Sequence, residues 1–195
     1  MEDRANHGAV PPILFCILAA QYIAMPITRA VLSDVPELNT LINSAYRGES
    51  SKQGWTTEAE LLDGMRCDEA LLTEALLDPQ TIFLKYTDNE KILGCVRLDK
   101  HGDKLYLGML TVSPQLQGRG IGKELLKASE YEAAKLQCKT IYMTVISVRT
   151  ELVAWYERHG YLRTGERKPF ITEDARFGLA KMPLEFEVLE KSLSH

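Results

Sequence analysis

The feature that most constrains the fold is an apolar run that ends at a proline and leads through a glycine-rich turn into an amphipathic helix. In this segment, "TVSPQLQGRGIGKELLKASE", residues 111–130, glycines stand at positions 118, 120 and 122. Each glycine at a helix start costs roughly 0.5–1 kcal/mol of backbone entropy relative to alanine. Three of them in one turn therefore indicate that a ligand approaches the bare backbone.

Phosphate is the ligand group that such a turn favours. A helix start presents unpaired backbone N–H groups and the positive end of the helix dipole, and glycines allow close approach. Arg119 and Lys123 add positive charge. The Walker pattern fails because Gln117 stands at its first glycine and Glu124 follows Lys123, and the dinucleotide pattern fails because Lys123 replaces its third glycine. The alternative is a plain tight turn.

Helical periodicity predicts three helices before the first group of strands. Ser33 is expected to cap the first helix, which follows a short strand at residues 26–31. Thr57 and Glu60 form a T-x-x-E capping box for the second. Asp68 is expected to cap the third, over residues 69–77.

The period then changes to alternation, which predicts an antiparallel meander. The expected strands and helices from there on are strands at 81–86, 92–99 and 104–112, a helix after the glycine turn, a strand at 140–146, a helix at 151–159, and strands at 161–166 and 186–193. This order predicts an α+β fold with a mostly antiparallel mixed sheet flanked by helices. The glycine turn lies in its one strand–helix–strand crossover.

The glycine turn reads Q-x-x-G-x-G over residues 117–122, which resembles the acetyl-CoA-binding motif of the GNAT acyltransferase superfamily. The segment "WYERHGYLRTGERKPF", residues 155–170, is similar to that family's second hallmark: a helix with an aromatic–Tyr pair, then Gly, then an aromatic residue that opens a strand. The order of elements from about Met25 to Leu193 also follows the family. The resemblance implies a GNAT-like domain over residues 25–195 with acetyl-CoA as cosubstrate and no metal.

The resemblance also implies roles for individual residues. The backbone of the glycine turn would hold the pyrophosphate and the end of the preceding strand the pantetheine arm: Leu110, Thr111, Val112, Gln117, Gly118, Arg119, Gly120, Ile121, Gly122 and Lys123. Tyr156 stands where the family has the tyrosine that protonates the departing sulfur, and acyl transfer independently needs such an acid. The alternative for Tyr156 is a buried aromatic residue whose hydroxyl merely finds a partner.

Two positions depart from the family pattern. Arg149 replaces a frequent Asn, so it contacts either a CoA phosphate or an acidic substrate, or is a solvated arginine at a helix start. The strand at 104–112 has no carboxylate to act as general base. A water relay, Glu49 or Glu58 is expected to take that role, although both glutamates also suit solvated or capping positions.

Three further side chains are candidates for the acceptor site. Tyr46 and Trp55 flank the polar loop that would border it, and Arg97 would meet a substrate carboxylate if it points into the cleft rather than snorkelling. The expected reaction is acetyl transfer from acetyl-CoA to a primary amine of a small molecule, by direct transfer in a ternary complex. A peptide or protein N-acetyltransferase and a non-catalytic acyl-CoA-binding sensor are the alternatives.

Charge and cysteine content limit the partners. The net charge of -4 argues against a nucleic-acid protein. The widely spaced Cys16, Cys67, Cys95 and Cys138 predict buried thiols in a reducing, cytoplasmic compartment. The last strand suggests a possible homodimer through a sheet edge.

The first 24 residues are expected to lie outside the fold. The apolar run at residues 10–25 is too short for a membrane span, so no membrane partner is expected. A mistaken start before Met25, a cleaved targeting segment and a surface-packed appendage are the open readings of this extension.

Overall fold

The computed structural model describes residues 26–171 and 174–193. Residues 1–24, which were predicted to lie outside the fold, are not among the described residues. The α-helices and strands in chain order are β1 Ile27–Arg29, α2 Val35–Tyr46, α3 Gly48–Ser51, β2 Leu62–Asp63, α4 Glu69–Leu77, β3 Thr81–Asp88, β4 Lys91–His101, β5 Lys104–Val112, α5 Ile121–Lys135, β6 Thr140–Ile146, α6 Thr150–Glu157, β7 Leu162–Pro169, β8 Leu179–Ala180 and β9 Glu185–Ser192.

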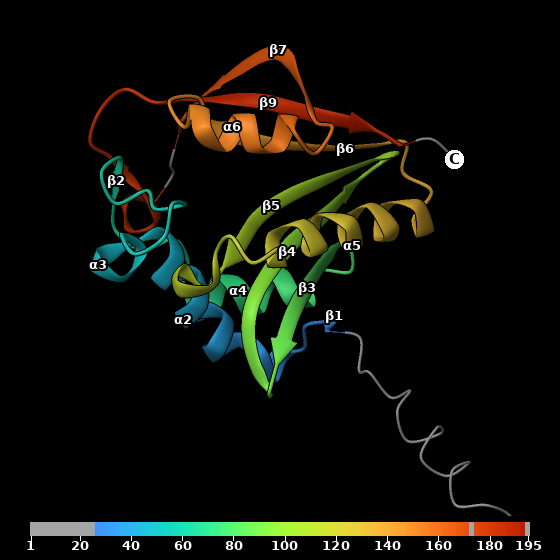
Figure 1. The fold of residues 1–195 in the computed structure, drawn as a ribbon, viewed down its shortest axis with the longest axis horizontal. Helices are drawn as coiled ribbons and strands as arrows, with labels where there is room; N and C mark the ends of the chain where they lie inside the picture. Colours follow the sequence, from blue (N-terminus) through green and yellow to red (C-terminus); the bar gives the residue numbers. More distant parts are fainter. Residues whose placement is uncertain (1–25, 172–173, 194–195) are drawn as a thin grey trace, which may run out of the picture.

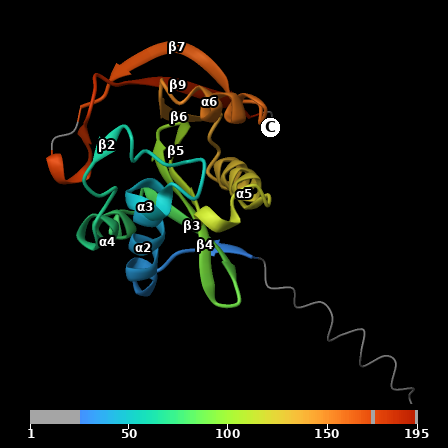
Figure 2. The ribbon, with the colours of Figure 1, turned by 60° about the vertical axis from the view of Figure 1, so that its left-hand side comes forward.

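Seven of these strands form one sheet in the order β1-β3-β4-β5-β6-β9-β7. Every neighbouring pair is antiparallel except β5 and β6, which are parallel and are joined by α5. A parallel pair needs such a crossover because a hairpin cannot connect it. Helices α2 and α4 cover one face of the sheet and α5 the other (Figures 1 and 2). The predicted α+β fold is confirmed.

Side chains of β5 pack on both faces of the sheet, because an irregularity of the strand at Met109 interrupts their alternation. Leu105 and Leu107 pack with the buried stripe of α5 and with Tyr156 of α6, whereas Met109 packs with α2 and α4 on the other face. The stripe predicted for α5 is buried as expected: Ile121, Leu125, Leu126 and Ala133. One strand thus contributes side chains to the core on both faces of the sheet.

Two predicted helix starts are wrong. The T-x-x-E pattern at Thr57 starts no helix, because Thr57 Oγ1 lies 2.6 Å from Ser51 Oγ and accepts a hydrogen bond from the N–H of Ala59. That chain segment instead turns into the short strand β2, which pairs with β8. Helix α2 begins at Val35, so Asp34 and not Ser33 occupies its N-cap position.

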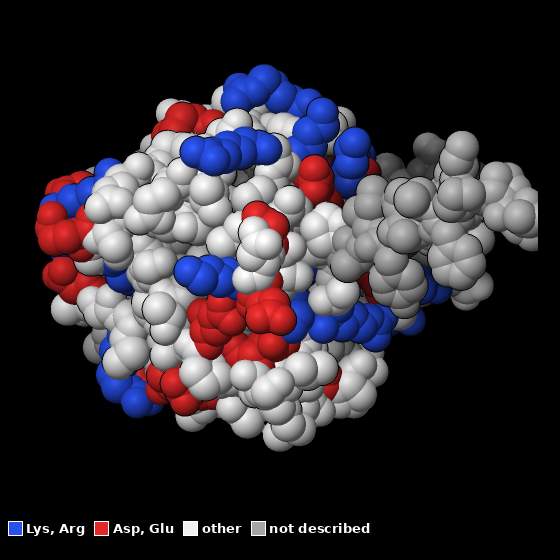
Figure 3. All heavy atoms as spheres, turned by 60° about the horizontal axis from the view of Figure 1, so that its bottom comes forward, with Lys and Arg blue, Asp and Glu red and all other residues white. Residues whose placement is uncertain are grey.

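The cap predicted at Asp68 is confirmed. Its side chain accepts a hydrogen bond of 2.8 Å from the N–H of Leu71 in the first turn of α4. The three described cysteines are buried and unpaired, as predicted: Cys67, Cys95 and Cys138. No helix within the described residues is long and apolar enough to cross a membrane. Acidic and basic side chains are interspersed on the face shown in Figure 3.

A bulge in β5 opens the centre of the sheet. Arg97 of β4 pairs with Gly108, but Cys95 pairs with Thr111, so β5 has one residue more than its partner, and Met109 has a φ of +49°. On its other side β5 pairs with β6 only over Lys104–Tyr106. Beyond that point the two strands diverge (Figure 1). A backbone bulge beside a gap between parallel strands is the setting of the candidate site.

Candidate active site

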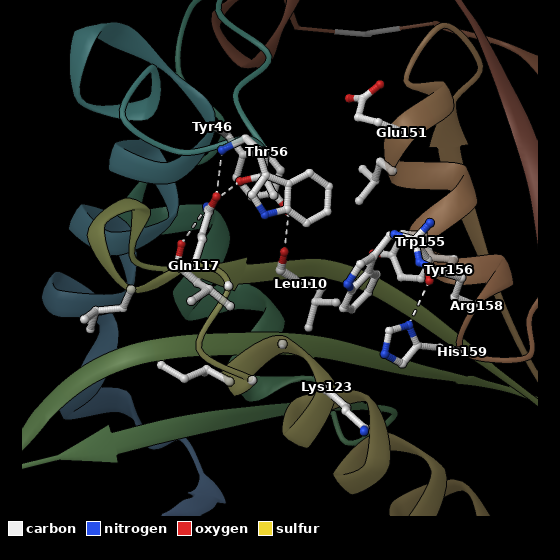
Figure 4. Close-up of a pocket in the computed structure, with 18 residues that line it drawn as sticks. Tyr46, Thr56, Leu110, Gln117, Lys123, Glu151, Trp155, Tyr156, Arg158 and His159 are labelled. Carbon is white, nitrogen blue, oxygen red and sulfur yellow. Dashed lines mark hydrogen bonds between the residues drawn. The ribbon is translucent and has the colours of Figure 1, made fainter.

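A cavity of about 570 Å³ lies at the gap between β5 and β6, and is called cavity 1 below. Figure 4 shows its walls: the glycine turn, the end of β5, helix α6 and the loop around Thr56. Most of the predicted cofactor-binding residues line it: Leu110, Val112, Gln117, Gly118, Gly120, Ile121, Gly122 and Lys123. Arg119 is exposed and Thr111 is buried, and neither side chain lines the cavity.

The backbone of the glycine turn leaves room for a ligand. Gly118 has a φ of +80° and Gly120, which caps α5, a φ of +94°. A Cβ built on either would meet no protein atom within 4 Å. The first helical hydrogen bond runs from Glu124 N to Gly120 O, so the preceding N–H groups have no helical acceptor. With Lys123 and Arg158 in the lining, this cradle fits the phosphate groups of CoA.

The side chain of Gln117 ties this turn to residues 54–57, a segment called the strap below. Gln117 Oε1 accepts a hydrogen bond of 2.8 Å from Trp55 N, and its Nε2 donates to Thr56 Oγ1 at 2.8 Å and to Val112 O at 3.2 Å (Figure 4). A Cβ on Gly54 would lie 2.6 Å from Gln117 Oε1. A side chain at position 54 would therefore displace the carboxamide of Gln117 from these hydrogen bonds.

Arg149 holds the strap from the other side. Its guanidinium donates to three strap carbonyls, Trp55 O at 2.9 Å, Thr56 O at 3.3 Å and Thr57 O at 2.8 Å, and its Nε donates to Glu151 at 2.6 Å. The side chain is 8% exposed. The expectation of a solvated arginine is therefore wrong. Because most of its N–H groups already have protein acceptors, Arg149 acts in this structure as a support for the wall of cavity 1.

Tyr156 of α6 faces cavity 1 (Figure 4). Its ring packs edge-on against Trp155, with centroids 5.0 Å apart. Within the described residues its hydroxyl forms no hydrogen bond, so the alternative of a hydroxyl that merely finds a protein partner is not what the structure shows. Burial raises the pKa of Tyr156 well above its ordinary value. The phenol therefore stays protonated and is free to donate.

Tyr46 and Trp55, two of the predicted acceptor-site residues, also line cavity 1. Tyr46 Oη donates a hydrogen bond of 2.8 Å to Leu110 O, directly at the bulge. Burial raises the pKa of Tyr46, so this hydroxyl keeps its proton. The indole of Trp55 lies 6.2 Å from that of Trp155, across the cavity.

The two predicted bases lie elsewhere. Glu49 is exposed and pairs with Lys52 at 2.7 Å. Glu58 forms an ion pair with the buried Arg47. Neither carboxylate lines cavity 1.

A second cavity of about 560 Å³, called cavity 2 below, is lined by the opposite face of the same strands. Met109 lines cavity 2 and its neighbour Leu110 lines cavity 1, so the two cavities approach the bulge from opposite sides. Much of the wall of cavity 2 was not predicted from the sequence, including Arg66, Asp99, Tyr106 and Tyr142. The available signal was the alternation of β5, in which Tyr106 separates two core leucines and must face away from them.

Arg97 lines cavity 2 but already has a carboxylate partner. Its Nε donates a hydrogen bond of 3.0 Å to Asp99 Oδ1. The same oxygen accepts a hydrogen bond of 2.5 Å from Thr81 Oγ1. Arg97 thus lies in a cavity wall, the condition set for a contact with a substrate carboxylate, while its charge is balanced by Asp99. No group of three or more potential metal ligands occurs among His, Cys, Asp and Glu of the described chain.

Comparison with known proteins agrees with this architecture. The model of the acetyltransferase (GNAT) domain matches residues 48–176. A spermine/spermidine N(1)-acetyltransferase of Bacillus subtilis is 30% identical over 69 residues, 35% of this chain and 45% of that protein. A mycothiol acetyltransferase of Mycobacteroides abscessus is 29% identical over 132 residues, 66% of this chain and 42% of that protein. The chain thus spans less than half the length of these curated relatives.

Solved structures share the fold over most of the chain. The ribosomal-protein-S18-alanine N-acetyltransferase of Escherichia coli superposes with a TM-score of 0.64 at 16% identity, over 87% of this chain and 94% of that one. The PaiA N-acetyltransferase of Thermoplasma acidophilum, solved in complex with coenzyme A, superposes with a TM-score of 0.61 at 17% identity, over 86% and 98%. The glycine turn, the bulged strand and the match over most of the chain lead to one conclusion: the protein belongs to the GNAT acetyltransferase family.

Proposed function

We propose that the protein transfers an acetyl group from acetyl-CoA to the primary amine of a small molecule, directly and within a ternary complex. The observation that carries this proposal is the bulge of β5, where consecutive residues line cavities on opposite faces of the sheet. One cavity has the glycine cradle for a phosphorylated ligand. The other lies where a second substrate reaches the same point from behind.

The binding residues follow from cavity 1. The helix-start N–H groups with Lys123 and Arg158 bind the phosphates. Beyond Tyr106, β5 pairs with no strand on the side of β6 within the described residues. Leu110 O and Val112 O accept from Tyr46 and Gln117, and the other main-chain groups there are available to an extended ligand arm. Acetyl-CoA supplies the thioester whose acetyl group the amine attacks. In that step the carbon–sulfur bond breaks, an amide bond forms, the amine loses a proton and the sulfur gains one.

Tyr156 is the proton donor of this proposal. Its side chain lines the cavity, and its hydroxyl keeps its proton because of burial and has no competing acceptor within the described residues. A leaving sulfur in the same dehydrated cavity also has a raised proton affinity, so the two groups are matched for transfer. Main-chain N–H groups at the bulge would stabilise the oxyanion.

The proton of the amine leaves through water in this proposal. Strand β5 has no carboxylate, and Glu49 and Glu58 are ion-paired away from cavity 1. The carboxylates that line the cavities are also engaged: Glu151 pairs with Arg149, Asp99 is bound by Arg97 and Thr81, and Asp78 accepts from Gln80 N. An acceptor of small size is favoured because cavity 2 has the volume of a small-molecule site. A peptide amino terminus remains the competing acceptor that the experiment separates.

The test combines binding with turnover. Calorimetric titration with acetyl-CoA measures affinity, and thiol release with a panel of small amines and peptides measures transfer. Tyr156→Phe should retain the affinity for acetyl-CoA and lose turnover. Binding without thiol release for any amine would indicate a sensor instead of an enzyme. Absence of binding would refute the assignment of cavity 1.

A further inference from the structure

Cavity 2 contains a guanidinium next to the bulge. Arg66 lines this cavity, and its guanidinium carbon lies 5.5 Å from the centroid of the Tyr46 ring. The hydroxyl of the same tyrosine donates to Leu110 O in cavity 1. A single aromatic side chain therefore separates the charge of Arg66 from the point where the two cavities meet.

Three carboxylates near Arg66 already have other cations, whereas Asp78 in the wall of cavity 2 accepts a hydrogen bond of 2.8 Å from Gln80 N and pairs with no cation within the described residues. Asp99 pairs with Arg97, and Glu58 pairs with Arg47. Asp68, two residues along the chain, pairs with Arg176 at 3.7 Å. Lys168, the other cation in the cavity wall besides Arg97, is 3.5 Å from Glu166.

Across the part of the chain that the structure describes, no carboxylate forms an ion pair with Arg66. Its side chain is nevertheless half-buried against Tyr46, where a guanidinium is less hydrated than at the surface. A guanidinium presents a planar fork of donors that matches a carboxylate in two parallel hydrogen bonds. The guanidinium of Arg66 is therefore available in cavity 2 to form an ion pair with an anionic group of a ligand.

One part of the wall of cavity 2 is aromatic and lies among polar and charged residues such as Gln80, Thr81 and Lys168. The ring centroids of Tyr106 and Tyr142 are 5.3 Å apart, and His101 stacks on Tyr106 at 6.4 Å. The hydroxyls already have partners, since Tyr106 Oη lies 3.0 Å from Thr144 Oγ1 and Tyr142 Oη lies 2.6 Å from His101 Nδ1. The rings remain as the part of this wall that a ligand contacts, which suits an apolar or aromatic group.

The geometry points to an α-amino acid with an apolar or aromatic side chain as the acceptor. Arg66 binds its carboxylate, the adjacent α-amine lies at the bulge, and its side chain packs on Tyr106 and Tyr142. This inference rests on the proposed acetyl transfer. It also disfavours polyamines, because their remaining ammonium groups would lie beside the guanidinium of Arg66.

Matched amines test the substrate class. Thiol release from acetyl-CoA should be faster with phenylalanine than with phenylalaninamide, phenethylamine or spermidine at equal concentration. The amide of phenylalaninamide lowers the proton affinity of its amine, so that compound has more neutral amine at pH 7 to 8. A preference for phenylalanine over it would therefore come from recognition of the carboxylate and not from reactivity.

Variants of Arg66 test the residue. Arg66→Gln should raise the KM for phenylalanine roughly 10- to 100-fold, as expected for loss of a charged hydrogen-bonding pair. It should leave the KM for phenethylamine and the affinity for acetyl-CoA unchanged. Arg66→Lys, which keeps the charge but not the fork, should recover part of the loss. Arg167→Gln removes the same charge from the exposed strand β7 and should change neither the KM for phenylalanine nor the affinity for acetyl-CoA.

Binding gives a second readout. With CoA present, phenylalanine should raise the melting temperature of the native protein and of Arg167→Gln but not that of Arg66→Gln. Equal use of phenylalanine and phenethylamine, or an unchanged KM in Arg66→Gln, would overturn the inference while acetyl transfer still stands. Absence of acetyl-CoA binding or of transfer to every amine would instead refute the proposed function itself.

Discussion

Replacing Arg149 by methionine removes the support of the strap. The side chain donates three hydrogen bonds from a charged group to strap carbonyls. Such bonds contribute about 1.5–3 kcal/mol each, which sets an upper limit near 9 kcal/mol. The strap lies at the surface, so water can replace part of this loss. We expect Arg149→Met to lower the free energy of unfolding by about 2–4 kcal/mol, or roughly 5–15 °C in Tm.

The same substitution should weaken acetyl-CoA binding, because Trp55 and Thr56 of the strap line cavity 1. Urea titration measures the stability and calorimetry the affinity. Arg167→Met is the matched control, since its ion pair with Glu185 is exposed and such pairs contribute at most about 1 kcal/mol. If Arg149→Met is as stable as this control and binds acetyl-CoA equally well, the assignment of Arg149 to the strap is wrong.

Three further substitutions test other parts of the site. Tyr156→Phe should lower kcat by about 10²- to 10⁴-fold with unchanged acetyl-CoA affinity, and an unchanged kcat would exclude it as the acid. Gly120→Ala forces a side chain to a φ of +94° and should lower the free energy of unfolding by about 1–2 kcal/mol and weaken acetyl-CoA binding strongly. The control Gly102→Ala, at a φ of +63° in the β4–β5 turn, should lower the stability alone. Tyr161→Phe removes a buried hydroxyl that has no partner within the described residues and should stabilise the protein by about 1 kcal/mol at pH 7, as urea titration would show. Because burial raises the pKa of Tyr161, the native state loses stability as pH rises above about 10, and this variant should flatten that loss by up to about 1.4 kcal/mol per pH unit.

Local patterns predicted most of the fold. The strands of the meander and the stripe of α5 follow from hydrophobic period alone, and the cap at Asp68 follows from a single side chain. The capping box at Thr57 failed because its hydroxyl pairs with Ser51 and its carbonyl accepts from Arg149, which is 92 residues away in sequence. Contacts of that range outweigh a local preference worth about 1 kcal/mol, and a sequence pattern does not contain them.

The candidate site divides in the same way. The glycine turn and Tyr156 were predictable because they belong to contiguous motifs. For Arg97 the sequence left open whether it points into the cleft or snorkels. Its partner Asp99 is two residues further along the same strand and so on the same face, a relation that the sequence does contain. Arg66 was not predictable, since its place in the wall of cavity 2 depends on packing against α2, where its backbone N–H donates a hydrogen bond of 2.8 Å to Asn43 Oδ1.

The bulge of β5 also limits the shape of an inhibitor that would occupy both cavities. Because Met109 and Leu110 line different cavities, the two proposed ligands lie on opposite sides of β5 and would meet at the bulge. A molecule that joins a CoA analogue to an amine must pass the bulge, so its thickness at the junction limits it to a few atoms in single file. Each end can then be changed without disturbing the other, and such a compound should bind and dissociate slowly.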